Sequence, residues 1–404
     1  MIPSFQLIKG GVTTPAGFKA AAHRAGIKAD APDMALLVSD VDAAVAGTFT
    51  TNAFRAPPVR LSAENLGTGS GRAVIINSGC ANACTGEQGL AAAQCMLAET
   101  AAALGVPENQ VFVCSTGEIG TQLPMDRVRA GIGELAAGLD PDGGDAAARA
   151  IMTTDAFDKQ RAVRLSVDGR EVTIGGMAKG AGMIHPNMAT MIAVLTTDAA
   201  VNPAALQTCF SDAVERSFNR VTVDGDTSTN DTALIFAGGQ AGNQPLSEAH
   251  ADWEAFTHAL HAVMLELALD MVRDGEGASR IVTIDVEGAA SELDAARAAK
   301  AIGTSLLVKT AWAGALPIWG RVLAAIGTSG AAFDDEAVDL WYDDIQLVAG
   351  GVGVPGLDRE AVRGVVLQDA FNLRVELNAG AAAYRMYASD CTEAYVKFNS
   401  EYLS

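Results

Sequence analysis

Apolar runs alternate with polar, alanine-rich segments along this chain, and the pattern predicts strands and helices in turn. Residues 73–77 and 111–114 are short runs of mainly apolar, β-branched and aromatic residues bounded by turn-forming residues, which predicts two buried strands. Between them, Thr85-Gly-Glu-Gln88 fits a capping box that opens an alanine-rich helix. Gly105 is the residue type expected where that helix ends.

The middle of the chain carries a hairpin signal followed by a helix signal. Residues 162–167 and 171–174 flank Asp168-Gly169, a two-residue turn that predicts a β-hairpin. A helix is expected from Pro203 to about Ser217, because proline is favoured at the first helical position.

The same alternation extends into the second half. Ser247 is a candidate cap for a long helix that runs to about Val272, and residues 280–286 predict a strand. Strands alternating with helices are typical of an α/β fold. Because no internal repeat or low-complexity linker interrupts the pattern, the best candidate boundary is a chemical one, the Ala189–Thr190 bond.

Composition and charge narrow the class of protein. The 404 residues carry a net charge of −20, which argues against nucleic-acid binding because such proteins need a basic face. The N-terminal residues lack the apolar core of a signal peptide, and no uncharged apolar stretch is long enough to span a membrane. We therefore expect a cytoplasmic protein whose six cysteines are free thiols. Cys80 and Cys84 lack a second ligand pair nearby, so no metal is expected.

The most informative segment is a glycine-rich loop at 175–189 that leads into Thr190 and an apolar run at 191–195. This arrangement predicts a loop that delivers a hydroxyl to the head of a buried strand. If the chain is cut before Thr190, the new α-amine, with a pKa of about 7.7 to 8.0, can deprotonate the hydroxyl of the same residue. Thr190 is therefore a candidate nucleophile. The alternative is an ordinary β-branched residue that opens a strand.

Six segments together resemble one family, the ornithine acetyltransferases, which are the glutamate N-acetyltransferases of arginine biosynthesis. The match covers nearly the whole chain and keeps the family's order. The segments are NSGCANACTGEQG at 77–89, STGEIG at 115–120, KGAGMIHPNMATMIAVLTTDA at 179–199, FNRVTVDGDTSTNDT at 218–232, VRDGEGAS at 272–279 and YVKFNSEYLS at 395–404.

The resemblance implies an α/β, self-cleaved, two-fragment fold with mixed sheets and flanking helices. The fragments 1–189 and 190–404 would stay entwined, and two of each would form a heterotetramer. In the implied ping-pong reaction, Thr190 takes acetyl from N2-acetyl-L-ornithine and passes it to L-glutamate, without a cofactor. Some members of the family also use acetyl-CoA as donor.

The resemblance also implies roles for residues at matching positions. Thr116 and Gly117 would stabilise the tetrahedral oxyanion, and Glu276 would both bind substrate and support catalysis. Cleavage would separate Ala189 from Thr190. The implied substrate ligands are Thr153, Lys179, Thr190, Glu276, Asn399 and Ser404.

Residue chemistry agrees with part of this set and leaves one choice open. A glycine-flanked lysine such as Lys179 can bind a substrate carboxylate, whereas a phosphate-binding P-loop is excluded because Gly180 follows it. Thr154 is not distinguished from Thr153 as a ligand. Residues 224–231 lack the ligand spacing of a calcium loop, which favours a polar loop that supports the site.

The histidines suggest no separate site. His258 and His261 lie three apart on a predicted helix without a third metal ligand, so they are expected to be ordinary helix residues. His185 lies five residues before Thr190, where the family usually has another residue type, and is interpreted as loop variation, not as a base.

Other departures from the family pattern concern Leu316 and Ile318, which replace two polar residues, and Glu118, whose charge lies beside the implied oxyanion site. The chain also ends in serine where threonine is commoner. Two other functions stay open: a related N-terminal-threonine amidase or aminopeptidase with water as acceptor, and an unprocessed, non-catalytic paralogue that binds a small molecule or a protein.

Overall fold

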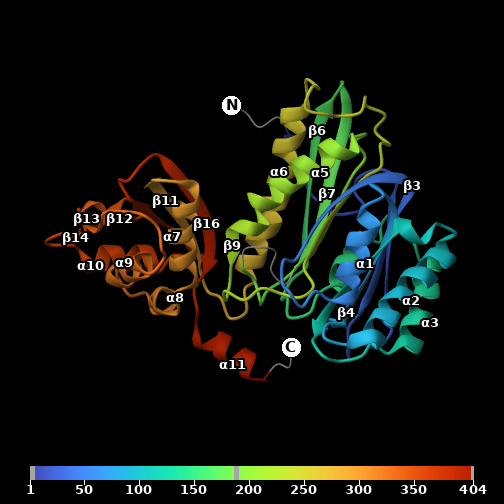
Figure 1. Cartoon of the computed structure of the whole chain (residues 1–404), viewed down its shortest axis with the longest axis horizontal. Coiled ribbons are helices and arrows are strands. Elements are labelled where there is room, and N and C mark those ends of the chain that lie inside the picture. Colours follow the sequence, from blue (N-terminus) through green and yellow to red (C-terminus); the bar gives the residue numbers. More distant parts are fainter. Residues whose placement is uncertain (1–4, 186–190, 402–404) are drawn as a thin grey trace.

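The computed structural model describes residues 5–185 and 191–401 and forms two lobes, each built on a mixed β-sheet (Figure 1). The sheet of the first lobe has the strand order β1 (Phe5–Ile8), β6 (Lys159–Val167), β7 (Arg170–Lys179), β8 (Ile192–Thr197), β10 (Thr232–Ala237), β3 (Met34–Phe49), β4 (Ser70–Cys80), β5 (Val111–Glu118), with β2 (Phe18–His23) paired to β3. Parallel pairs, such as β8 with β10 and β4 with β5, occur beside antiparallel ones. The predicted α/β class with mixed sheets is thus confirmed.

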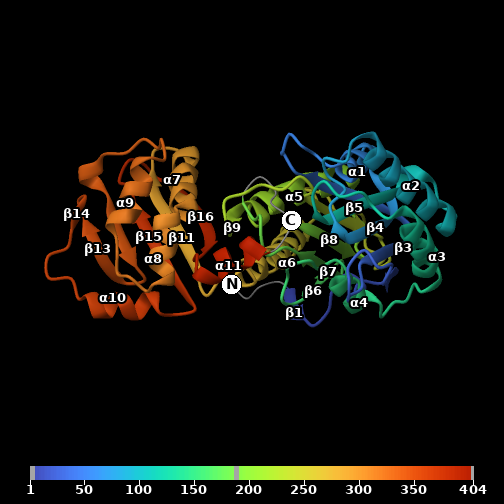
Figure 2. The same cartoon turned by 90° about the horizontal axis from the view of Figure 1, so that it is seen from below.

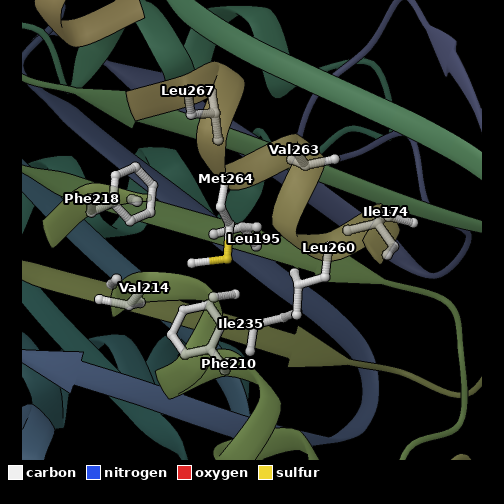
Figure 3. Close-up of a cluster of buried hydrophobic side chains, with 14 of the residues drawn as sticks. Ile174, Leu195, Phe210, Val214, Phe218, Ile235, Leu260, Val263, Met264 and Leu267 are labelled. Carbon is white, nitrogen blue, oxygen red and sulfur yellow. The ribbon is translucent and has the colours of Figure 1, made fainter. Parts of the chain in front are cut away.

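Helices cover this sheet, and the core lies between them and the strands. They are α1 (Pro57–Leu66), α2 (Gly86–Leu104), α3 (Met125–Ala137), α4 (Gly144–Ala150), α5 (Pro203–Glu215) and α6 (Trp253–Arg273). Figure 3 shows the largest buried cluster, where Leu260 and Met264 of α6 and Phe210 of α5 lie over Leu195 and Ile235 of the sheet. The central strands β8 and β10 are buried along their whole length and mainly apolar, because helices shield them from water.

The second lobe is a smaller unit of the same kind. Its sheet has the order β14 (Val352–Gly353), β13 (Ile345–Ala349), β12 (Asp339–Tyr342), β15 (Ala370–Glu376), β11 (Ile281–Ala289), β16 (Ala382–Ser389), β9 (Val221–Thr222). The helices of this region are α7 (Glu292–Thr304), α8 (Leu306–Ala313), α9 (Gly320–Gly327) and α10 (Arg359–Val366). Short 3-10 helices occur before β5, before β9 and before β12; they are η1 (Glu108–Gln110), η2 (Phe218–Arg220) and η3 (Asp335–Ala337).

Besides the turn between α6 and β11 (Ile281–Ala289), two described segments link the lobes. The short strand β9 comes from the chain of the first lobe but pairs with β16 of the second. The last helix, α11 (Glu393–Glu401), follows β16 and lies at the junction of the lobes in both views (Figures 1 and 2).

Most predicted elements are present, and local signals located them best. The hairpin of β6 and β7 turns at Asp168 and Gly169, whose φ angles of 52° and 71° are those of a two-residue type I′ turn. The two buried strands are present as β4 and β5, which extend beyond the predicted ranges. Gly105 ends α2 in the left-handed conformation, with φ of 66°.

Both predicted side-chain caps were wrong. Thr85 precedes α2, but its hydroxyl donates to Asn82 Oδ1 at 2.8 Å and caps no backbone N–H. Ser247 does not start the long helix, which begins at Trp253 after Asp252. At Thr85 the local sequence signal was overruled by this contact within the loop.

The Ala189–Thr190 bond lies outside the described residues, but the strands on either side of it are placed. β7 precedes the bond, β8 follows it, and the two pair along six residue positions, from Ile174 with Thr197 to Lys179 with Ile192. Fragments 1–189 and 190–404 would therefore share one sheet. The two lobes do not divide at this bond, and the two-fragment organisation stays a prediction.

Of the described helices, α6 alone is long and apolar enough to cross a membrane by length and composition. Its apolar side is occupied, because ten of its residues are buried and it packs on β6 and β7. This is the position of a core helix in a globular lobe.

Candidate active site

A polar cavity of about 190 Å³ lies where the first lobe meets α11. Its walls come from the ends of β5 and β7, the loop after β9, the turn after α6, and α11. The lining residues are Ala81, Thr116, Gly117, Ile119, Thr153, Thr154, Lys179, Gly182, Met183, Asp224, Asp226, Ser228, Thr229, Asn230, Glu276, Tyr395 and Asn399. Segments that are distant in sequence thus converge on one small volume, suited to a ligand of amino-acid size.

The cavity brings together the site residues predicted from the sequence that lie in the described part of the chain. These are Thr116, Gly117, Thr153, Lys179, Glu276 and Asn399. Ala189, Thr190 and Ser404 lie outside the described residues. The nearest described neighbour of Thr190 is Met191, whose backbone N–H donates to Asp231 Oδ1 at 2.9 Å.

Lys179 ends β7 and is the cation of the cavity wall. Its side chain is 2% exposed, and its ammonium donates to Thr153 Oγ1 at 2.7 Å and to Thr116 Oγ1 at 3.3 Å. Burial lowers the pKa of Lys179, and the nearby Asp155 carboxylate opposes this shift. Thr153 and Thr154 both line the cavity, but the hydroxyl that accepts the hydrogen bond from Lys179 is that of Thr153.

Thr116 and Gly117 lie at the end of β5, where the backbone of β4 comes very close. Gly117 has φ of 130°, and a Cβ at this position would clash with the backbone of Gly79 and Cys80. Glycine is therefore required by space as well as by conformation. Asn230 joins the segment that follows β4 to the end of β5, because its Nδ2 donates to Ala81 O at 2.6 Å and to Ser115 O at 2.9 Å.

Glu276 lies on the turn after α6 and reaches both sides of the cavity. Its backbone N–H donates to Ala181 O at 2.9 Å, and its carboxylate accepts from Asn399 Nδ2 at 2.9 Å. A Cβ on Gly182 would collide with this carboxylate, so that glycine provides its space. Gly277, with φ of 67°, similarly allows the backbone of α11 at Tyr395 to approach.

Three acidic residues also line the cavity and form what we call its acidic wall. They are Asp224, Asp226 and Glu276. Asp224 accepts from the N–H of Met183 at 2.6 Å and of Ile184 at 3.0 Å. Burial raises the pKa of Asp224 to about 6, and the carboxylates of Asp226 and Glu276 add to the shift. The cavity can therefore hold a zwitterionic ligand, with a carboxylate at Lys179 and an ammonium at the acidic wall.

Comparison with known proteins identifies the family. The ArgJ family model matches residues 19–404. The chain belongs to the ArgJ family. The arginine biosynthesis bifunctional protein ArgJ of Symbiobacterium thermophilum is 50% identical over 398 residues, covering 98% of this chain and 99% of that protein. The protein of the same name from Geobacter sulfurreducens is 47% identical over 387 residues, covering 96% and 98%.

Solved structures are also similar in part. The ornithine acetyltransferase of Mycobacterium tuberculosis, complexed with ornithine, is 44% identical with a TM-score of 0.42, over 45% of this chain and 98% of that one. The ArgJ protein of Bacillus halodurans is 40% identical with a TM-score of 0.43, over 46% and 100%. The family matches confirm the resemblance predicted from the sequence, and this chain is an ArgJ-family enzyme of arginine biosynthesis.

Sequence reasoning missed a buried ion cluster behind this ArgJ site. Lys159 of β6 lies between Asp155 and Asp274, with Nζ–O distances of 2.7 and 2.5 Å. Asp155 also lies 3.9 Å from Lys179 Nζ. Asp155 and Asp274 each lie two residues from a predicted site residue, Thr153 or Glu276, and this was the available signal in the sequence. No local pattern, however, shows that Lys159 meets Asp274, which lies 115 positions away.

Three departures from the family pattern in the described chain do not line the cavity, although Glu118 lies between the lining residues Gly117 and Ile119. Of the described residues, the wall includes Ile119 but neither Glu118, Leu316 nor Ile318. The expected effect of the Glu118 charge on the oxyanion site stays a prediction. His185, interpreted as loop variation, has its Nδ1 3.3 Å from Thr222 Oγ1, and burial lowers its pKa.

The predicted polar loop at 224–231 does support the site, and five of its residues line the cavity. His258 and His261 lie on α6 and line a separate groove. The single group of possible metal ligands found among the described residues is Asp168, His250 and Asp252, where the β6–β7 turn meets the loop before α6. Hydrogen bonds and an ion pair join its members to one another.

Proposed function

We propose that this chain transfers an acetyl group from N2-acetyl-L-ornithine to L-glutamate through an acetyl-Thr190 intermediate. The observation that carries the proposal is the meeting of Lys179, Thr116, Thr153, Glu276 and Asn399 at one cavity of amino-acid size. Both substrates bear an α-carboxylate, for which Lys179 is the buried cation.

The first half-reaction forms the ester. The Thr190 hydroxyl attacks the acetyl carbonyl while its α-amine takes the hydroxyl proton. The hydroxyl of Thr116 donates to the developing oxyanion, with Gly117 beside it. When the tetrahedral intermediate collapses, the C–N bond breaks, the α-ammonium returns the proton, and ornithine leaves as an amine.

The second half-reaction reverses these steps with glutamate. Its neutral amine attacks the acetyl ester, the Thr190 oxygen leaves and regains a proton, and N-acetylglutamate is released. Glu276 accepts a hydrogen bond from Asn399 and lies in the cavity, where it can orient the attacking amine. One pocket thus serves donor and acceptor in turn.

The N-terminal amine arises, in this proposal, by self-cleavage at Ala189–Thr190. The hydroxyl attacks the Ala189 carbonyl, an N-to-O shift gives an ester, and water hydrolyses it. The shared sheet of β7 and β8 supports the expectation that the two fragments remain together, two of each forming a heterotetramer.

The proposal extends to a second donor and to the compartment. Curated relatives are named bifunctional, so we include acetyl-CoA as an alternative source of the acetyl group. The six free cysteines are consistent with the reducing cytoplasm.

The test is an assay of purified protein with acetylornithine and glutamate, each alone and together, with and without acetyl-CoA. Glutamate-dependent release of ornithine with formation of N-acetylglutamate supports the proposal, and Thr190→Ala is the matched control. Ornithine release that needs no glutamate would instead indicate the amidase. Absence of turnover together with an uncut chain would indicate the non-catalytic paralogue.

A further inference from the structure

Lys159 occupies a buried position behind the cavity wall and is not among the residues that line it. Its side chain is 0% exposed and forms ion pairs with Asp155 at 2.7 Å and Asp274 at 2.5 Å. Such a buried ammonium is costly unless its charge is compensated, and here two carboxylates compensate it.

Asp155 lies between two lysines and is closer to one of them than to the other. Its Oδ1 is 2.7 Å from Lys159 Nζ, whereas its Oδ2 is 3.9 Å from Lys179 Nζ. Burial alone would raise the pKa of Asp155, but Lys179 and Lys159 outweigh this and hold the pKa near 2. The carboxylate is therefore ionised at neutral pH, and its close partner is Lys159.

Lys179 instead uses two of its three N–H donors on the neutral hydroxyls of Thr153 and Thr116. Neither hydroxyl neutralises the ammonium, and the ion pair with Asp155, at 3.9 Å, is longer than hydrogen-bond distance. The positive charge at the cavity wall is thus only partly compensated and can attract an anion in the cavity.

We propose that Lys159 is a positioning residue that neutralises Asp155 and so keeps the ammonium of Lys179 available to the α-carboxylate of both substrates. The inference rests on the transferase function proposed above. Without Lys159, the unpaired carboxylate of Asp155 would draw Lys179 across the 3.9 Å gap, away from Thr116 and from the substrate. Asp274 is paired with Lys159 in the same cluster and forms no ion pair with Lys179.

Substituting Lys159 tests this competition directly. In Lys159→Met, the KM values for glutamate and acetylornithine should both rise by roughly tenfold or more, as expected when a charge-assisted contact is lost. Because the effect is on binding, kcat should change less than KM.

Two double variants of equal net charge separate electrostatic competition from a general packing defect. Adding Asp155→Asn to Lys159→Met removes the competing carboxylate, so KM should fall again by at least about threefold. Adding Asp274→Asn leaves Asp155 ionised, so KM should stay high. If Lys159→Met leaves KM unchanged, or if both double variants bind equally poorly, Lys159 has no such role.

The comparison between the double variants remains decisive if the single variant does not fold, because each removes one of the buried carboxylates left without Lys159. Calorimetric measurement of L-glutamate binding to the two double variants makes the same comparison without turnover. A wild-type protein that binds glutamate but transfers no acetyl group would refute the proposed function and still allow this comparison. A wild-type protein that does not bind glutamate would overturn both.

Discussion

The ammonium of Lys179 donates a hydrogen bond of 3.3 Å to the hydroxyl oxygen of Thr116. An ammonium has no lone pair to accept with, so Thr116 is the acceptor and its own proton is directed elsewhere. In the proposed reaction that proton meets the developing oxyanion. One hydrogen bond therefore links the residue that binds the substrate carboxylate to the residue that stabilises the transition state.

Thr116→Ala removes this donor and should lower kcat by roughly 10²- to 10³-fold with little change in KM, the usual loss for one oxyanion donor. Steady-state assays with acetylornithine and glutamate measure both constants. Thr116→Ser is the matched control, because it keeps a hydroxyl at the same position. An unchanged kcat in Thr116→Ala would place the oxyanion site elsewhere.

Lys179→Met should weaken both substrates, because both lose the same carboxylate partner. A buried, charge-assisted hydrogen bond contributes about 1.5–3 kcal/mol, so KM should rise by roughly tenfold or more for each. Ornithine should also be a competitive inhibitor against glutamate in the wild type. If only one substrate lost affinity in Lys179→Met, donor and acceptor would occupy different pockets.

Processing should yield two fragments of 189 and 215 residues, which together make up the 404 of the chain, apart from any removal of Met1. The reason is that the α-amine of Thr190 becomes the general base only after the preceding bond is broken. Intact-mass measurement of the wild type and of Thr190→Ala checks this; the variant should remain one inactive chain. Full-length wild-type protein that transfers acetyl groups would exclude the N-terminal-amine mechanism.

The sequence alone located elements that depend on local interactions. The β6–β7 hairpin follows from Asp168-Gly169, since the turn needs positive φ at both positions. Capping was less predictable, because Thr85 has a competing acceptor in Asn82, a contact that depends on how the loop folds. The fold class followed from alternation, whereas the division into two lobes left no composition signal.

The site was predictable as far as family motifs reach. Lys179 and Glu276 lie 97 positions apart, yet their motifs placed both in the cavity that they line. The Lys159–Asp274 ion pair was not predictable, because no periodicity connects a strand residue to the turn after a distant helix. Asp224 was recognised as part of a polar loop, but its raised pKa depends on burial that only the folded chain creates.

Ornithine inhibition should strengthen as pH rises from 5 to 7. Burial raises the pKa of Asp224 to about 6, so its carboxyl is largely protonated at the lower pH and largely ionised at the higher one. Ionisation adds a negative charge to the acidic wall, which favours the side-chain ammonium of ornithine. The inhibition constant should fall by roughly two- to fivefold, the range for a partly exposed ion pair.

Two controls isolate the contribution of Asp224 to this pH effect. Asp224→Asn cannot ionise, so the step near pH 6 should disappear from the inhibition profile. L-norvaline has the same carbon chain without the side-chain ammonium, and it should show no gain between pH 5 and 7 in the wild type. An unaltered step in Asp224→Asn would assign the titration to another group.

Gly182→Ala should impair catalysis without unfolding the protein, because the three atoms nearest to the new methyl group all belong to the carboxylate end of Glu276. That flexible side chain can move aside, but it would then lose its place in the cavity and its hydrogen bond from Asn399. We expect a fall of roughly tenfold or more in kcat/KM, within the range for a misplaced catalytic group, and a melting temperature close to that of the wild type.

Gly117→Ala is the contrasting variant, since its methyl group meets the rigid backbone of Gly79 at a φ of 130° and should lower the melting temperature as well. Activity equal to the wild type in Gly182→Ala would mean that the observed position of the Glu276 carboxylate is not needed for the reaction.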